Sequence, residues 1–208
     1  MARLTTAKPT VAAFDVDGTL TTRDCVVPFL RRVRGVGGLA GALAARSGRL
    51  VPALVRRDRD AVKAVATEAA FTDRPVAEVE ALGTTFAAEV HHDWLRAEVV
   101  DRLHRHRADG HTVVLVSASF GAYLRPLAAL LGGAAVIATE LEIDGNGICT
   151  GRLDGGNCRG AAKVLRLHEW LSSTAGGRSD VELWAYGDSP GDRPLLADAD
   201  HAVWVGRR

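Results

Sequence analysis

Four short apolar runs along this chain are bounded by glycine or by polar residues, which is the pattern of buried β-strands. They cover residues 11–14, 111–116, 181–186 and 201–205. The segment over 140–150 is centred on Asp-Gly-Asn-Gly and predicts a β-hairpin.

Helical spacing of apolar residues separates these runs. It covers residues 92–107, with a stop signal at Gly110, and then residues 121–131 and 161–171. Pro126 lies inside the second of these helices and is expected to kink or break it. Strands that alternate with helices predict an α/β fold with a doubly wound, Rossmann-like parallel sheet.

Two aspartates follow the first strand. Asp15 and Asp17 are one position apart in Phe-Asp-Val-Asp-Gly-Thr-Leu, and in an extended strand they would share a face. Binding groups collect at the carboxyl ends of parallel strands. Two carboxylates there suit a nucleophile and a general acid/base beside a metal ion. The same pair also occurs in solvated turns, so its meaning depends on the rest of the chain.

Further polar residues lie after the later strands or in the helix between them. Ser117 comes after the second strand, Lys163 lies in a predicted helix, and Asp188 and Asp192 follow the third strand in Gly-Asp-Ser-Pro-Gly-Asp. Each has an ordinary alternative: Ser117 as a helix cap, Lys163 as an exposed helix residue, Asp188 as a turn residue. Lys163 is one of three lysines in a chain with 23 arginines, which favours a position that needs a compact ammonium.

This set of motifs resembles the haloacid dehalogenase-like hydrolases and occurs in that family's order. The resemblance covers residues 10–22 and 92–205 and points to the phosphoserine-phosphatase-like branch (subfamily IB). It implies an α/β core formed by residues 1–22 and 91–208, with a mainly helical cap inserted over residues 23–90. The branch includes members that resemble phosphatidylglycerophosphate phosphatases.

The resemblance also implies a role for each motif residue in a phosphatase. Asp15 would attack phosphorus and carry the phosphoryl group, and Asp17 would act as general acid and then as general base. Ser117 and Lys163 would contact the phosphoryl oxygens. Mg²⁺ is implied as the cofactor, with four ligand residues: Asp15, Asp17 through its backbone carbonyl, Asp188 and Asp192.

Two positions depart from phosphoserine-specific members. Asp24 stands where those members carry a glutamate that helps to hold the substrate amino group, and the shorter carboxylate reaches less far. Ala118 follows Ser117 where glycine is usual, so its side chain is expected to affect how the substrate sits. The expected partner is therefore a small or lipid-linked phosphate monoester whose identity the sequence leaves open.

Other functions fit parts of the pattern. A phosphomutase or phosphotransferase on the same core would keep both carboxylates. A receiver-like regulatory module also combines acidic residues, magnesium, a hydroxyl and a lysine, but its phosphorylated aspartate lies on a middle strand without a long insertion. A phosphate-binding module without activity would not need every motif carboxylate.

Net charge and cysteine usage limit the expected partners and the expected cellular compartment. The formal net charge of +1 gives no basic field for nucleic acid. Cys25, Cys149 and Cys158 have no C-x-x-C spacing, so neither a disulfide framework nor a zinc site is expected. This cysteine usage indicates a reducing compartment. Polar residues follow the N-terminus in place of the apolar core of a signal peptide, so a cytoplasmic protein is expected. No oligomeric state follows from the sequence.

The predicted cap is unevenly charged. Residues 23–60 hold nine arginines and three aspartates. This excess of positive charge would attract an anionic substrate or an anionic membrane surface. The alternative is that the arginines form the solvated face of a helix. Peripheral membrane contact is possible on this basis but not expected. Arginines interrupt the apolar stretch over 36–55 and argue against a membrane span. Residues 35–40 fit G-x-G-x-x-A but follow no strand, so a dinucleotide site is not expected. The histidine pairs His91/His92 and His104/His106 are expected on helix surfaces.

Overall fold

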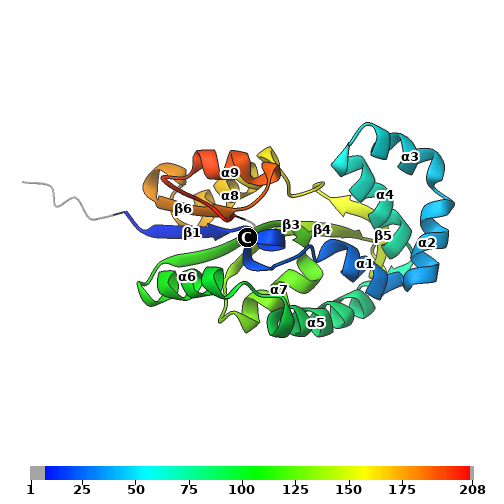
Figure 1. Cartoon of the computed structure of the whole chain (residues 1–208), viewed down its shortest axis with the longest axis horizontal. Coiled ribbons are helices and arrows are strands. Elements are labelled where there is room, and N and C mark those ends of the chain that lie inside the picture. The colour runs from blue at the N-terminus through cyan, green and yellow to red at the C-terminus, as the bar shows by residue number, and fades with distance from the viewer. Residues whose placement is uncertain (1–7, 207–208) are drawn as a thin grey trace, which may run out of the picture.

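The computed structural model describes residues 8–206 and shows an α/β fold around one seven-stranded sheet (Figure 1). The strands lie in the order β2–β5–β4–β3–β1–β6–β7. The five strands from β4 to β7 in this order pair in parallel, which confirms the doubly wound core. The strands are β1 (Thr10–Phe14), β2 (Arg74–Pro75), β3 (Thr112–Phe120), β4 (Ala135–Ile143), β5 (Ile148–Asp154), β6 (Glu182–Gly187) and β7 (His201–Trp204).

Helices cover both faces of the sheet. In Figure 1, α8 and α9 lie on one face, α6 and α7 lie on the other, and α1–α4 group beyond the end of the parallel strands. The helices are α1 (Val26–Arg34), α2 (Val36–Ala44), α3 (Ser47–Val55), α4 (Arg59–Phe71), α5 (Val76–Asp93), α6 (Ala97–Ala108), α7 (Gly121–Leu130), α8 (Ala161–Thr174) and α9 (Arg193–Asp198).

The period of two along the central strands explains these layers. In β1, Val11 and Ala13 pack with the apolar residues of α8 and α9, whereas Ala12 and Phe14 pack with those of α6 and α7. All four side chains are buried. A strand buried on both faces has a continuous apolar sequence, which is the run that the sequence shows.

The predicted hairpin around Asp-Gly-Asn-Gly is confirmed, and its two strands, β4 and β5, extend beyond residues 140–150. β4 is a single strand that pairs in parallel with β3 in its first part and antiparallel with β5 in its second. β5 also pairs with the two-residue strand β2 from the inserted segment. The hairpin therefore extends the core sheet toward the insertion instead of standing apart from it.

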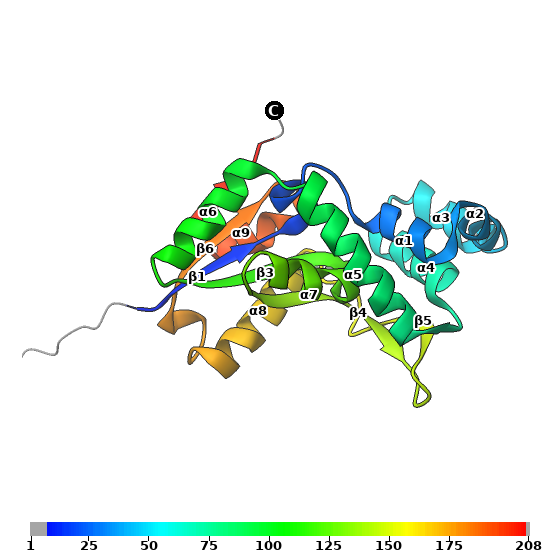
Figure 2. The same cartoon turned by 90° about the horizontal axis from the view of Figure 1, so that it is seen from below.

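Residues 23–90 do not form an isolated helical group. Figure 2 shows α1–α4 together, while α5 runs back alongside α7 of the core. A Cβ atom on Gly83 of α5 would lie 2.2 Å from the backbone oxygen of Ala122 in α7, so this close packing needs glycine. Whether the insertion acts as a separate cap stays a prediction.

The predicted start of the helix over residues 92–107 is wrong. His92 belongs to the end of α5, and α6 begins at Ala97. The chain is extended in between because Leu95 forms a β-bridge with Thr21, where the chain enters the insertion. A break at Pro126 is also wrong, since α7 continues through it.

The structure also bears on three further expectations from the sequence, for residues 36–55, for residues 35–40 and for His106. The stretch over 36–55 is divided between α2 and α3, and no helix among residues 8–206 is both long and apolar enough to cross a membrane. Residues 35–40 lead from α1 into α2 without a preceding strand. His106 is buried, not on the surface as expected, and hydrogen bonds Tyr186 Oη at 2.8 Å.

Candidate active site

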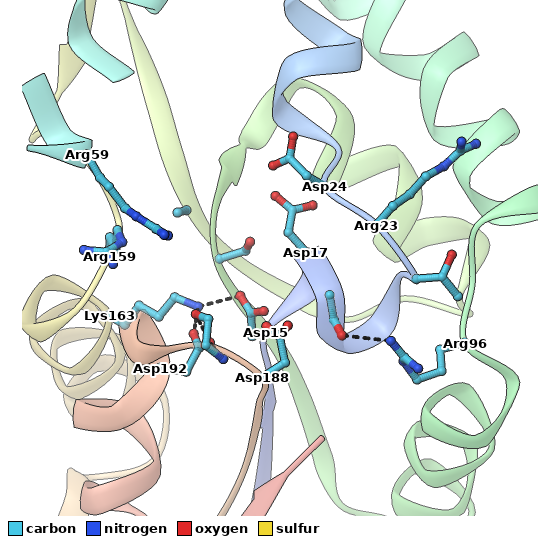
Figure 3. A pocket seen from close by; sticks show the side chains of 16 residues that line it. Asp15, Asp17, Arg23, Asp24, Arg59, Arg96, Arg159, Lys163, Asp188 and Asp192 are labelled. Carbon is cyan, nitrogen blue, oxygen red and sulfur yellow. Dashed lines mark hydrogen bonds and ion pairs between the residues drawn. The ribbon is translucent and has the colours of Figure 1, made fainter. Parts of the chain in front are cut away.

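The carboxyl ends of β1, β3 and β6 meet at one edge of the sheet and form the floor of a cavity of about 530 Å³. All of the predicted site residues line this cavity (Figure 3). They are Asp15, Asp17, Asp24, Ser117, Ala118, Lys163, Asp188 and Asp192. The remaining wall includes Arg23 and Arg59 of the insertion, Arg96 just before α6, and Arg159 in the loop before α8.

Asp15 is held from two sides at the end of β1. Its Oδ1 accepts a hydrogen bond from Lys163 Nζ at 2.5 Å, and its Oδ2 accepts one from Thr19 Oγ1 at 3.0 Å. Asp15 and Lys163 are both buried, at 5% and 2% exposure. The carboxylate therefore has a fixed orientation, with few rotamers to lose when a substrate binds.

Lys163 joins two carboxylates. Its ammonium lies 2.6 Å from Asp192 Oδ1 as well as beside Asp15. Burial alone would lower the pKa of Lys163, but the two carboxylates outweigh it and raise that pKa. Lys163 is thus a buried ammonium whose charged form two carboxylates favour, and its alternative role as an exposed helix residue is wrong.

The two carboxylates beside Lys163 respond differently. Burial raises the pKa of Asp15 to about 7, although Lys163 opposes this shift. The pKa of Asp192 is lowered despite burial, because Lys163 and Ser189 donate to its oxygens. Of these two carboxyls, Asp15 is the one whose ionised form would be favoured more by a further positive charge in the cavity.

Asp17 has separate partners from Asp15. Its Oδ2 accepts a hydrogen bond from Ser119 Oγ at 2.6 Å, and its Oδ1 accepts one from the backbone N–H of Cys25 at 3.0 Å. Burial and the nearby Asp24 raise the pKa of Asp17. A carboxyl with a raised pKa, held in place but not bonded to the lysine, suits proton transfer.

Three carboxylates form a candidate metal site. Asp15, Asp188 and Asp192 each offer an oxygen, and these oxygens lie within 4.8 Å of one another. Gly18 has φ +86°, and a Cβ atom there would lie 2.3 Å from Asp188 Oδ2, so the turn after β1 leaves room for that carboxylate only with glycine. An all-oxygen donor set fits a hard cation such as Mg²⁺.

Apart from Lys163, the predicted substrate contacts are Asp24, Ser117 and Ala118, and these three differ in their surroundings. Asp24 is exposed, and its Oδ2 accepts a hydrogen bond from the backbone N–H of Val27 at 3.1 Å, so it also caps α1. Ser117 is buried, and its Oγ accepts from the N–H of Ser119 rather than capping α7. The carbonyl of Ala118 accepts from Thr139 Oγ1 at 2.8 Å and from Lys63 Nζ.

The sequence prediction missed Arg96, which lines the cavity, and Ser119, which bonds Asp17 without lining the cavity. Ser119 follows Ser117 by two positions in β3, a spacing that places both on one face and could have drawn attention to it. Arg96 donates to the carbonyls of Gly18 and Thr19 at 3.2 and 3.3 Å and so fixes the turn after β1. Nothing in the local sequence marks Arg96, because its partners lie 77 and 78 residues away.

Comparisons with known proteins agree with this arrangement. The family model of haloacid dehalogenase-like hydrolases matches residues 12–197. Protein CicA of Caulobacter vibrioides is 37% identical over 93% of this chain and 84% of its own length. A probable phosphatase of Mycobacterium tuberculosis is 26% identical over 94% of this chain and 68% of its own length.

Solved structures show the same fold. A protein of unknown function from Bordetella pertussis Tohama I superposes with a TM-score of 0.76 and 26% identity, over 92% of this chain and 87% of that one. A phosphoserine phosphatase in its apo form has a TM-score of 0.58 and 18% identity, over 92% of this chain and 84% of that one. The second likeness is one of architecture and confirms the phosphoserine-phosphatase-like type of fold.

Proposed function

This chain belongs to the haloacid dehalogenase-like hydrolases, and on that basis we propose that it is a Mg²⁺-dependent phosphatase of phosphate monoesters. The observation that carries the proposal is the contrast between its two neighbouring carboxyls. Asp15 contacts the buried ammonium of Lys163, whereas Asp17 is held apart by Ser119. Different environments for two carboxyls at one strand end are suited to two different roles, a nucleophile and an acid/base.

The reaction follows from these positions. Asp15 attacks phosphorus, the bond between phosphorus and the ester oxygen breaks, and Asp17 gives its proton to the leaving alkoxide. Asp17 then takes a proton from a water molecule that attacks the aspartyl phosphate. Inorganic phosphate leaves and Asp15 is regenerated, so protons and bonds balance over the cycle.

The other residues stabilise charge on the transferred group. Ser117 would donate its hydroxyl to a phosphoryl oxygen, and Lys163 supplies a positive charge that needs no reorganisation. Asp15 and Asp188, the backbone carbonyl of Asp17, and Asp192 directly or through its neighbours would hold the Mg²⁺. When bound, this ion would offset negative charge on the phosphoryl oxygens.

Related proteins support the hydrolysis of a phosphate ester, since one of them is named a probable phosphatase. Residues 23–90, as a cap over the strand ends, would select among small or lipid-linked esters. A phosphomutase on this core would share the first step and return the phosphoryl group to a second substrate instead of water.

The test is phosphate release from a panel of monoesters, with Mg²⁺ or with chelator, by the wild type and by Asp15→Asn. The panel contains phosphoserine, glycerol 3-phosphate, sugar phosphates and phosphatidylglycerophosphate. We expect release that needs Mg²⁺ and disappears in Asp15→Asn. Normal release by Asp15→Asn would refute the covalent mechanism, and transfer to a second sugar without free phosphate would indicate the mutase.

A further inference from the structure

Lys63 of the inserted helix α4 reaches the core of the molecule. Its ammonium donates a hydrogen bond to the backbone carbonyl of Ala118 and lies 3.4 Å from Thr139 Oγ1. It also lies 4.6 Å from the ring centroid of Phe120. None of these three partners is a carboxylate. The ammonium is therefore directed at the end of β3, where Ser117 and Ala118 line the cavity.

Burial makes the charged form of Lys63 unfavourable in the folded protein. It lowers the pKa of this lysine to about 8, from an ordinary value of 10.5, and the charge of Asp17 opposes the shift without cancelling it. The folded chain thus gives up stability to keep an ammonium at this place. Such a residue is typical of a position that serves function more than stability.

The segment that Lys63 contacts lies outside the regular pairing of β3. The register between β3 and β4 shifts between Val116 and Phe120, where residues 117–119 of β3 stand opposite a single residue of β4. Pairing of β3 with β1 has already ended at Leu115. A bulge of this kind interrupts the ladder of backbone hydrogen bonds and re-aims the side chains within it. Its backbone groups therefore need partners from elsewhere.

Two side chains hold the carbonyl of Ala118 in this bulge. Thr139 Oγ1 donates to it at 2.8 Å from β4, and Lys63 donates to it from the insertion. At the other end of the same peptide unit, the N–H of Ser119 donates to Ser117 Oγ at 3.2 Å. Because a peptide unit is planar, contacts at both ends fix its rotation.

This peptide unit joins two hydroxyl groups of the site. Ser119 Oγ donates to Asp17 Oδ2 at 2.6 Å. Ser117 Oγ accepts from the N–H of Ser119, which directs its own O–H elsewhere and suits the donation to a phosphoryl oxygen proposed above. A rotation of the peptide unit between them would displace both hydroxyls at once, and small displacements of such groups are costly in rate.

We propose that Lys63 is a positioning residue, which rests on the phosphatase function proposed above. From the insertion it holds the bulge of β3, and through the bulge it orients the hydroxyls of Ser117 and Ser119. Lys63 does not line the cavity, so it acts through these residues and not on the substrate. The insertion would then complete the catalytic geometry of the core, in addition to selecting the substrate.

The experiment compares two replacements of Lys63. Lys63→Met keeps the length of the side chain without its ammonium, and Lys63→Arg keeps a charged donor. Lys8→Met is the matched control, because Lys8 is exposed and precedes β1 at the end of the strand away from the cavity. We would measure kcat and KM for the ester of the panel above that the wild type hydrolyses fastest, and the melting temperature of each protein.

We expect kcat of Lys63→Met to fall about tenfold to a hundredfold with little change in KM, because a charged hydrogen bond is lost. Its melting temperature should stay near that of the wild type, and Lys63→Arg should recover part of the rate. A purely structural role would lower the melting temperature and leave kcat of the folded protein unchanged. Unchanged kcat in Lys63→Met would overturn the inference while leaving the phosphatase function intact.

A double variant tests the route through the bulge. If Lys63 acts through Ser119, Lys63→Met should cost less kcat in Ser119→Ala than in the wild type, because residues that act through one another are not additive. Two losses that multiply in full would mean that Lys63 acts independently of the bulge, and would overturn the inference.

A binding measurement separates this inference from the proposed function. Orthovanadate adopts the five-coordinate geometry of a phosphoryl group in transfer, so its calorimetric titration in Mg²⁺ needs no turnover. We expect its Kd to be about tenfold higher for Lys63→Met than for the wild type and Lys8→Met, even if no ester is hydrolysed. Equal affinities of the wild type and Lys63→Met, or no binding by either, would overturn the inference.

Discussion

The hydroxyl of Ser119 lies 2.6 Å from Oδ2 of Asp17, joining the end of β3 to the turn after β1 across 102 residues of sequence. On the other oxygen of Asp17, the backbone N–H of Cys25 donates at 3.0 Å. The backbone bond comes from the start of the insertion, so it survives any change in β3. Ser119 is therefore the side chain that sets the rotation of the proposed acid/base.

Replacement of Ser119 tests this positioning role. In Ser119→Ala we expect kcat to fall about tenfold to a hundredfold with little change in KM, because a charged hydrogen bond to Asp17 is lost. Ser119→Thr keeps a hydroxyl and should recover part of the rate. The measurement is steady-state phosphate release, with Ser173→Ala on the exposed face of α8 as control. A change in KM alone would speak for a substrate contact instead.

Asp188 is expected to govern metal affinity. A ligand that binds only the folded state at 100 times its Kd adds about 2.7 kcal/mol to the free energy of unfolding, so Mg²⁺ should raise the melting temperature. Asp188→Asn should lose most of this rise, while Asp101→Asn on the exposed face of α6 should keep it. An equal rise in both variants would place the ion elsewhere.

Gly18 is predicted to be intolerant of any side chain. Gly18→Ala would force its Cβ atom against Asp188 and should weaken Mg²⁺ binding more than it weakens the fold. Gly110→Ala is the matched control, since Gly110 also has positive φ, at +78°, but open space around it. Both should lose about 1 kcal/mol from backbone strain. A Mg²⁺ titration of activity should separate them, and equal titration curves would contradict the steric argument.

Lys63 should give the stability a pH dependence. Burial lowers its pKa to about 8, from an ordinary value of 10.5. The unfolded chain then binds more protons than the folded one between pH 8 and 10.5, so this lysine makes the free energy of unfolding rise with pH in that window. Urea unfolding of the wild type and Lys63→Met should show a difference that changes across the window.

The control for that titration is Lys8→Met, which removes an exposed lysine near β1. Its difference from the wild type should stay constant over the same pH values. If the Lys63→Met difference is also constant, the ammonium is not disfavoured by its position between α4 and β3.

The sequence was sufficient for the central strands and for the motif residues at their ends. Apolar runs buried on both faces are unambiguous, and residues that follow parallel strands meet at one edge whatever the loops do. The extent of β4 could not be predicted, because its two halves pair with different strands. The start of α6 depends on a bridge between Leu95 and Thr21, which lie far apart in the chain.

The walls of the cavity were harder to predict than its floor. Nine arginines in residues 23–60 have no local feature that separates those facing the cavity from those facing solvent. Arg59 is placed by the bond between Asp60 and Asn157, and Arg32 by Glu89 on α5. Such choices depend on contacts between distant segments, which periodicity does not record.

One cluster of aromatic rings crosses the proposed boundary between cap and core. Phe29 and Phe86 of the insertion lie with ring centroids 4.8 and 5.2 Å from that of Tyr123 on α7, and Phe71 lies 5.0 Å from Phe120. Neither part could bury these rings by itself. The chain should therefore melt as one cooperative unit, and an insertion transplanted from a relative would have to bring matching rings with it.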